Sequence, residues 1–242
     1  MHREVAVLVL GIIVVLAAVD YLDIYLKDEV APELKPVTEP GTARIRLLGV
    51  GPEGSGVAAW LTVESKPGTG KILADIDELL FFSDVQVSIR EAKSIAQSIT
   101  GIDLNKVDLL YMIELDAVTS NRTTVAGPSA GAGLTIATIA AVEGEALNES
   151  ITITGDVDLS GNILSVGGLE EKALAAQRAG ISLFLIPAEQ GALSRSVKRF
   201  KCDEFCRIDY IRQDVESVAG IPVREVSTIE EAYAYFKNEK LV

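Results

Sequence analysis

The most constraining feature of this sequence is a stretch of small and apolar residues between positions 124 and 142. It reads TVAGPSAGAGL and continues as TIATIAAV, without a single charged side chain. A helix that is apolar on all sides has to be buried, and its glycines and alanines let neighbouring elements pack closely. We therefore expect the segment from Pro128 onward to be a central helix in a domain with a sizeable core.

Ser129 lies where this helix is expected to begin. Gly127 can adopt a positive φ, and Pro128 is preset for the first turn of a helix. The first backbone N–H groups of a helix are unpaired and form the positive end of its dipole, which suits a nucleophile or an anion. Serine is also a favoured N-cap residue, so this stretch alone leaves both a catalytic serine and a simple cap open.

The histidine content limits the partners of a serine nucleophile. The only histidine among the 242 residues is His2. A Ser-His-Asp triad, a Cys-His pair and a histidine-rich zinc site are therefore implausible. A base for Ser129 has to be a lysine or a carboxylate, and we expect neither a metal nor another cofactor.

Charge and cysteine content narrow the possible partners further. The net charge of −13 argues against nucleic acid, which needs clustered cations. A local basic cluster between residues 195 and 201 is interpreted as the solvated face of a helix. Cys202 and Cys206 are too few for a structural zinc site. They are expected to form a short disulfide outside the cytoplasm, with two unpaired thiols as the alternative.

The N-terminus carries an unbroken apolar run at residues 5–19, shorter than the roughly 20 residues that span a bilayer. Extension to residue 26 reaches that length and places two tyrosines at the interface, where tyrosine is enriched. We expect residues 1–30 to be a membrane anchor, with a cleaved signal peptide or a buried core helix as the alternatives. Acidic residues follow the run, so the positive-inside tendency predicts a single-pass protein with its main domain outside the cytoplasm.

The remaining chain divides into a proline-rich linker, 31–41, and a folded domain, 42–242. Strands are expected at 42–50, 56–65 and 107–115, the first two as a hairpin, and a helix at 84–99. The segment 66–71 lacks the first glycine and the final Ser or Thr of a phosphate-binding P-loop, so we expect a turn.

In the C-terminal half, expected strands alternate with expected helices. The strands are at 150–154, 163–166, 182–186 and 222–226, and the helices are at 169–179, at 228–236 and between residues 187 and 222. This alternation predicts βαβ units. The fold class is thus α+β, with mixed sheets and βαβ units, preceded by an N-terminal hydrophobic helix.

Lys172 is the candidate base. It lies in GGLEEKALAA at 167–176, a helix whose other face is apolar. A free lysine has a pKa of about 10.4, whereas a general base at neutral pH needs a pKa of roughly 7–8, and burial can lower it that far. A solvated lysine on an amphipathic helix is the alternative.

Three spaced motifs resemble the proteolytic domain of Lon proteases. They are Gly-Pro-Ser-Ala-Gly at 127–131, Thr-Gly-Asp at 154–156 and Gly-Gly-Leu-Glu-Glu-Lys at 167–172. The spacing of Ser129 and Lys172 matches the Ser–Lys dyad of that family, and the resemblance covers about residues 42–240. It implies a Lon-type domain and a serine endopeptidase with Ser129 as nucleophile and Lys172 as base. The supporting residues that it implies are Thr154, which would orient the lysine, Gly127, Ala130 and Asp156.

The chain departs from the family pattern near these motifs. Ala126 stands where many members have an acid, and Asp156 stands where glutamate is commoner. Glu170 replaces a lysine found in relatives. A carboxylate there would favour the charged form of Lys172 and oppose its action as a base, unless it points to solvent.

No ATPase module accompanies these motifs in the sequence. The chain therefore resembles the membrane-anchored, ATP-independent Lon-like proteases of archaea. The resemblance implies hydrolysis of unfolded or extended polypeptides, and a homo-oligomer, since Lon domains form hexameric rings. Two other functions stay open: a catalytically inactive Lon-like protein that binds peptides or acts as a scaffold, and a small-molecule kinase whose glycine-rich loop holds phosphate.

Overall fold

The computed structural model describes residues 34–51, 54–75, 79–81, 83–115, 123–125, 127–202 and 206–237. The chain divides into two units, Met1–Leu34 and Lys35–Val242, and the second contains the folded domain. The expected anchor at residues 1–30 lies outside the described residues. Among the helices that the structure does describe, none is long and apolar enough to cross a membrane.

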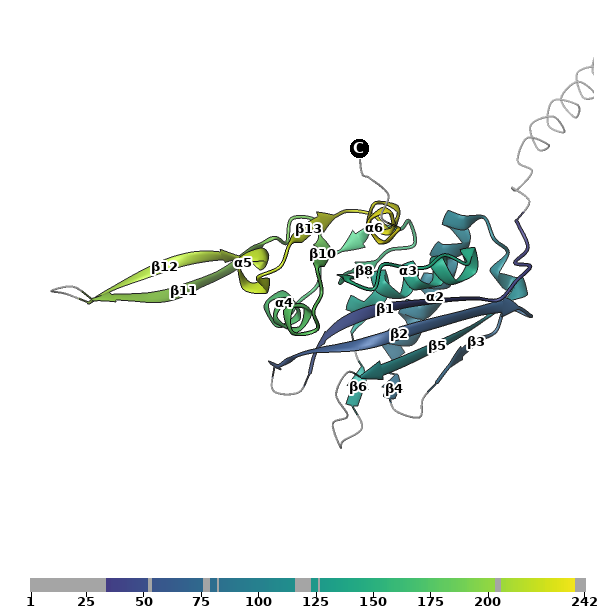
Figure 1. Cartoon of the computed structure of the whole chain (residues 1–242), viewed down its shortest axis with the longest axis horizontal. Coiled ribbons are helices and arrows are strands. Elements are labelled where there is room, and N and C mark those ends of the chain that lie inside the picture. The colour runs from purple at the N-terminus through teal and green to yellow at the C-terminus, as the bar shows by residue number, and fades with distance from the viewer. Residues whose placement is uncertain are drawn as a thin grey trace, which may run out of the picture. The chain divides into compact units, whose positions relative to one another are not determined.

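The centre of the domain is a seven-stranded mixed sheet with the strand order β13-β10-β7-β1-β2-β5-β3 (Figure 1). Its strands are β1 Gly41–Val50, β2 Gly56–Pro67, β3 Ile72–Ala74, β5 Val107–Leu115, β7 Ile151–Ile153, β10 Leu183–Pro187 and β13 Val223–Val226. Strands β1, β2 and β5 are antiparallel neighbours. Strands β1, β7, β10 and β13 are parallel, as are β3 and β5. The predicted N-terminal hairpin and the mixed sheet are confirmed.

Helices cover both faces of this sheet. Leu185 of β10 joins one hydrophobic core, formed with α2 (Ser83–Thr100), α3 (Gly131–Glu143) and α6 (Ile229–Phe236). Its neighbours Phe184 and Ile186 join a second core, formed with α4 (Leu169–Arg178) and α5 (Val215–Ala219). Because successive residues of a strand point to opposite faces, the two cores lie on opposite sides of the sheet.

Helix α3 is the central helix that the sequence predicts. Every residue from Gly131 to Val142 is buried, which confirms the expectation from its missing polar face. Close packing is required at Gly133, where a Cβ atom would lie only 2.5 Å from Cδ2 of Leu47 on β1. Small residues in this helix therefore set how closely it approaches the sheet.

The predicted βαβ units are also confirmed. Strand β7 leads through α4 to the parallel strand β10, and β10 leads through α5 to the parallel strand β13. Parallel strands need such crossover connections. The carboxyl end of β7 and the start of α4 are thereby brought to the same region of the domain, and these two places carry Thr154 and Lys172.

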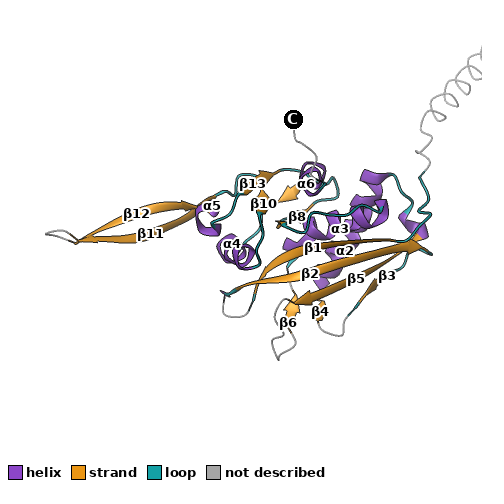
Figure 2. Cartoon of the chain, in the orientation of Figure 1, coloured by secondary structure: helices purple, strands orange, loops and turns teal. Residues whose placement is uncertain are grey.

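The interpretation of residues 195–201 as a helix face is wrong. They belong to β11 (Ala192–Cys202), which pairs with β12 (Cys206–Asp214) in an antiparallel two-stranded ribbon (Figure 2). The backbones of the two strands are paired from Ser196, opposite Arg212, to Cys202, opposite Cys206. This pairing decides the structure of the segment, although the local spacing of its charges suits a helix. The side chains of both cysteines, and with them the expected disulfide, lie outside the described part of the structure.

Short strands complete the fold beside the main sheet. Strand β8 (Asp156–Val157) pairs antiparallel with β9 (Ile163–Leu164), whereas the sequence predicted only the second of these. Strand β4 (Leu79–Phe81) pairs in parallel with β6 (Thr123–Val125). Because β4 leads into α2 and β6 leads into the Ser129 turn, this small sheet holds the two segments next to each other.

Candidate active site

Ser129 lies in a single turn of 3-10 helix, η3 (Pro128–Ala130), which runs directly into α3. Gly127 precedes it with φ 95° and ψ 145°, a region that is nearly restricted to glycine. The tight turn before the helix is thus confirmed, although the α-helix itself begins at Gly131. Neither η3 nor α3 has a side-chain cap, so Ser129 is not a capping residue.

Lys172 lies in the first turns of α4 and points into the protein. Its exposed fraction is only 3%, so the alternative of a solvated lysine is wrong. Burial lowers the pKa of Lys172 from 10.5 to about 8, and the Glu171 carboxylate acts in the opposite direction. Desolvation outweighs the attraction of the carboxylate because the amine loses nearly all of its contact with water.

Thr154 follows the end of β7 and connects the serine turn to the lysine. Lys172 Nζ donates to Thr154 Oγ1 across 3.0 Å, and Thr154 Oγ1 donates to the backbone carbonyl of Ser129 across 3.2 Å. The Thr154 N–H donates to the Leu185 carbonyl on β10 across 3.1 Å. The structure therefore brings Ser129, Thr154 and Lys172 together.

Backbone hydrogen bonds fix the serine turn against the end of β7. Gly155 N–H donates to Ser129 O, and Ala132 N–H donates to Gly155 O, both across 3.0 Å. Gly131 N–H donates to Pro128 O within the turn. Since the N–H groups of Gly131 and Ala132 are already paired, donors for a substrate oxyanion have to come from earlier in the turn.

The Ser129 hydroxyl makes no hydrogen bond to Lys172 in this state; within the described residues Lys172 Nζ is bonded to Thr154 instead. Such bonds often tighten only when substrate is bound.

The other predicted site residues take less direct positions. Asp156 Oδ1 accepts the N–H of Val157 across 2.8 Å, and Ala130 precedes the first residue of α3. Ala126 lies outside the described residues. The carboxylate that raises the pKa of Lys172 belongs to Glu171, so the expected effect of Glu170 is supplied by its neighbour.

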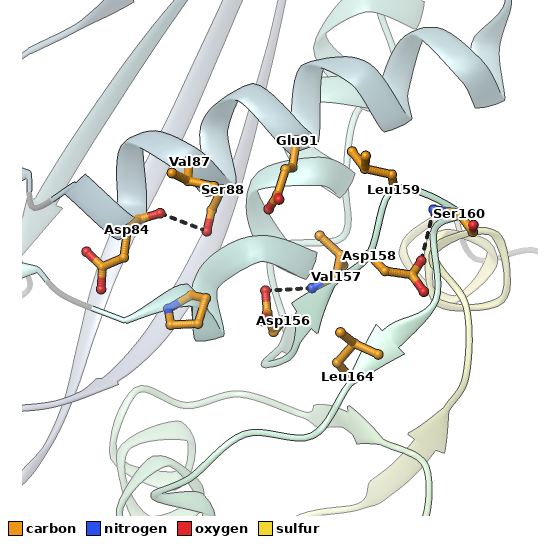
Figure 3. Close-up of a pocket in the computed structure, with 11 residues that line it drawn as sticks. Asp84, Val87, Ser88, Glu91, Asp156, Val157, Asp158, Leu159, Ser160 and Leu164 are labelled. Carbon is orange, nitrogen blue, oxygen red and sulfur yellow. Dashed lines mark hydrogen bonds between the residues drawn. The ribbon is translucent and has the colours of Figure 1, made fainter.

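A groove of about 730 Å³ opens beside the serine turn (Figure 3). It extends from Pro128, the residue before Ser129, along α2 and the β8–β9 region. Its lining combines four carboxylates with an apolar surface: Asp84, Glu91, Asp156, Asp158, Val87, Val157, Leu159 and Leu164. This groove was not predicted from the sequence. The spacing of Asp84, Ser88 and Glu91 could have indicated it, because it places the three residues on one face of a helix.

The described residues include no group of three or more His, Cys, Asp or Glu that could hold a metal ion. The groups that the described residues bring together at this site are the Ser129 hydroxyl, the buried Lys172 amine with its lowered pKa, and backbone amides.

Comparison with known proteins agrees with this geometry. Residues 86–200 match the family model described as the Lon protease (S16) C-terminal proteolytic domain. The Lon protease of Methanosarcina barkeri is 33% identical over 129 residues, which cover 51% of this chain and 15% of that protein. The Lon protease of Chloroflexus aggregans is 50% identical over 62 residues, covering 26% of this chain and 8% of that protein.

A more extended match is the peroxisomal Lon protease homolog 2 of Caenorhabditis briggsae, at 28% identity over 163 residues, which cover 66% of this chain and 19% of that protein. The chain thus spans less than one fifth of the length of these curated relatives. The segment matched by the family model includes Ser129, Thr154 and Lys172. Residues 86–200 are therefore similar in sequence to the proteolytic domain of Lon proteases, a serine peptidase family.

Proposed function

We propose that this chain is a serine endopeptidase in which Ser129 is the nucleophile and Lys172 is the general base. The observation that carries the proposal is the buried amine of Lys172. Its pKa is lowered to about 8, and it is hydrogen-bonded to the same threonine hydroxyl that bonds the Ser129 backbone. A lysine that only stabilised the fold would more commonly lie at the surface with its charge in water.

The lowered pKa increases the fraction of Lys172 side chains that are neutral at pH 7 by orders of magnitude. With a pKa of about 8, about a tenth of the Lys172 side chains are neutral at pH 7; with an unperturbed pKa the fraction would be roughly 3 in 10,000. Neutral Lys172 takes the proton of the Ser129 hydroxyl as the oxygen attacks the peptide carbonyl. The resulting ammonium then protonates the leaving amine, and the acyl-enzyme is hydrolysed by a water that Lys172 deprotonates in turn.

The serine turn supplies the remaining groups. The tetrahedral intermediate carries an oxyanion, and the N–H groups of Ser129 and Ala130 are its candidate donors because those of Gly131 and Ala132 are paired. One such donor is typically worth about 3–4 kcal/mol in the transition state. Thr154 holds the lysine amine beside the turn before and after each proton transfer.

The substrate is an unfolded or extended polypeptide. A groove that is open to solvent and about 730 Å³ in volume accommodates several residues of an extended chain but no folded domain. The residues proposed for catalysis lie within one domain and bind no nucleotide in this scheme, so we expect cleavage without ATP. The competing function is a Lon-like protein that binds peptides in this groove without cleaving them.

One comparison tests the proposal. The purified chain is assayed on unfolded casein and on a fluorogenic peptide, without ATP, alongside Ser129→Ala and Lys172→Met. We expect cleavage by the wild type and a loss of at least a thousandfold in both variants, because the dyad acts as a unit. Lys93→Met is the matched control, since Lys93 also has a pKa lowered by burial but bonds Gly70 O, away from the dyad.

Either of two results would reject the peptidase function: no cleavage by the wild type between pH 7 and 10, or equal activity of the wild type and both variants. Peptide binding without cleavage would support the scaffold function instead.

Two further properties are part of the same proposal. The apolar run at residues 5–19 would tether the domain to a membrane, and the check is membrane association that survives carbonate extraction and disappears on deletion of residues 1–30. The chain would also assemble into a homo-oligomer, as the resemblance to Lon domains implies, and native mass spectrometry in detergent measures the number of subunits.

A further inference from the structure

Asp84 makes a contact that the dyad chemistry does not account for. Its carboxylate Oδ2 accepts the backbone N–H of Gly127 across 2.5 Å, and its Oδ1 accepts the N–H of Val85 across 3.0 Å. Gly127 lies two residues before Ser129, whereas Asp84 lies 43 residues before Gly127, in the first turn of α2. One carboxylate therefore joins the start of a helix to the turn that carries the serine.

The small parallel sheet explains why these distant residues meet. Strands β4 and β6 run side by side with Phe81 opposite Val125. Asp84 follows the end of β4 by three residues, and Gly127 follows the end of β6 by two. Phe81 and Val125 are the last residues of the two paired strands. The segments that carry Asp84 and Gly127 therefore start from the same end of the small sheet.

Gly127 is the residue of the turn that most needs such support. A Cβ atom on Gly127 would meet no atom within 4 Å, so the space on that side of the residue is open. Its conformation, φ 95° and ψ 145°, is one of several that glycine adopts freely. The turn also has no side chain of its own that caps it. The hydrogen bond from the Gly127 N–H to Asp84 therefore favours this conformation.

We propose that Asp84 is a positioning residue for Ser129, which holds the Gly127 N–H so that the 127–130 turn presents the serine hydroxyl and the oxyanion donors in one fixed arrangement. This inference rests on the proposed peptidase function. A carboxylate suits the role because both of its oxygens accept hydrogen bonds, and both are used. Asparagine has only one acceptor oxygen and cannot satisfy the Val85 and Gly127 N–H groups together.

The test compares Asp84→Ala and Asp84→Asn with the wild type in the full chain. On the fluorogenic peptide we expect kcat to fall about 100-fold for Asp84→Ala and about tenfold for Asp84→Asn, which keeps one acceptor. The pH at which the rate levels off should remain near 8, because Asp84 acts on the serine turn and not on Lys172. A shift of that pH, or a kcat within twofold of wild type for both variants, would overturn the proposal.

A matched control separates positioning from general stability. Asp103 also accepts a backbone N–H at the start of a helix, from Asn105 across 3.2 Å, and lies at η2 (Leu104–Lys106), away from the dyad. Asp103→Ala should lower the unfolding midpoint about as much as Asp84→Ala while leaving kcat unchanged. Loss of kcat in both variants to the same extent would show that Asp84 has only a structural effect.

A second readout does not depend on activity. In protein labelled with ¹⁵N-glycine, the Gly127 amide should be protected from hydrogen exchange and shifted downfield in the wild type, and both effects should disappear in Asp84→Ala. If the wild type cleaves no peptide, the peptidase proposal fails, while this measurement still decides whether Asp84 holds the turn. A Gly127 amide that is equally protected in both proteins would contradict the positioning role.

Discussion

Lys172 Nζ donates a hydrogen bond to Thr154 Oγ1 across 3.0 Å, and the exposed fractions of the two residues are only 3% and 1%. The partner of the buried amine is a neutral hydroxyl. An ammonium group that is buried without a paired carboxylate is unfavourable, so its proton is lost more easily. This burial gives Lys172 the lowered pKa that the proposed general base requires, and most of the predictions below depend on it.

The first prediction concerns the pH dependence of catalysis. Because neutral Lys172 is the active form, kcat/KM should rise about tenfold per pH unit below pH 8 and level off above a pKa of about 8. Initial rates on the fluorogenic peptide between pH 6 and 10 measure this profile. A rate that still increases steeply at pH 10 would mean that the base has the pKa of a solvated lysine.

The second prediction concerns Glu171, whose carboxylate favours the charged form of Lys172. Glu171→Gln removes that attraction, so the inflection of the pH–rate profile should move to lower pH and the rate at pH 7 should increase. Glu170→Gln is the matched control on the preceding residue and should leave the inflection where it is. The interpretation would be wrong if only Glu170→Gln shifted the profile.

The third prediction concerns stability. The pKa of Lys172 is about 8 in the folded state and near 10.5 when unfolded. Below pH 8 both states are protonated, and the folded state bears the full cost of the buried charge. Between pH 8 and 10.5 the unfolded state binds more protons, so stability should rise with pH. The difference between the two pKa values corresponds to roughly 3 kcal/mol.

Lys172→Met should therefore be inactive but more stable than the wild type at pH 7, by up to roughly 3 kcal/mol. Urea unfolding of both proteins at pH 7 and pH 10 checks this, since the difference between them should shrink at the higher pH. If the variant is less stable than the wild type at pH 7, burial of Lys172 does not oppose folding.

The fourth prediction concerns the threonine between the two dyad residues. Thr154→Val keeps the shape of the side chain but removes the hydroxyl that accepts from Lys172 and donates to Ser129 O. We expect a loss of one to two orders of magnitude in kcat, because the amine is no longer held beside the turn. The inflection should move below pH 8, since the ammonium form loses a hydrogen-bond acceptor.

Thr154→Ser retains the hydroxyl and should restore most of the activity and the inflection near pH 8. Equal kcat values for the valine and serine variants would show that the hydroxyl has no part in positioning Lys172.

The fifth prediction concerns the backbone of the serine turn. Gly127→Ala introduces a Cβ atom that meets nothing within 4 Å, so its effect comes only from the conformation at φ 95° and ψ 145°. Such a residue costs about 1–3 kcal/mol. We expect the turn to relax and kcat to fall by more than tenfold, as measured on the fluorogenic peptide.

Gly144→Ala provides the comparison, because Gly144 ends α3 with φ 71° and its Cβ atom would likewise meet nothing within 4 Å. It should lower the unfolding midpoint without changing kcat. A similar loss of activity in both variants would indicate that general destabilisation explains the effect of Gly127→Ala.

Several elements could be predicted because their signals are local. The strand at Val107–Leu115 has the predicted bounds, and the buried helix α3 follows from the absence of charge between residues 131 and 142. The basic residues of β11 show where such signals fail. Their spacing suited a helix, but they belong to a strand that pairs with β12. Strand formation depends on a partner in a later part of the chain, and the local sequence does not indicate that partner.

The sequence by itself determined which groups were available for catalysis. With His2 as the only histidine, the base for Ser129 had to be a lysine or a carboxylate, and the motif spacing indicated Lys172. Only the tertiary structure brings these groups together. Burial lowers the pKa of Lys172. The end of β7 places Thr154 between Ser129 and Lys172. The β4–β6 pair brings Asp84 to Gly127. Each of these depends on contacts between distant segments, because desolvation and hydrogen bonding arise only when the chain is folded.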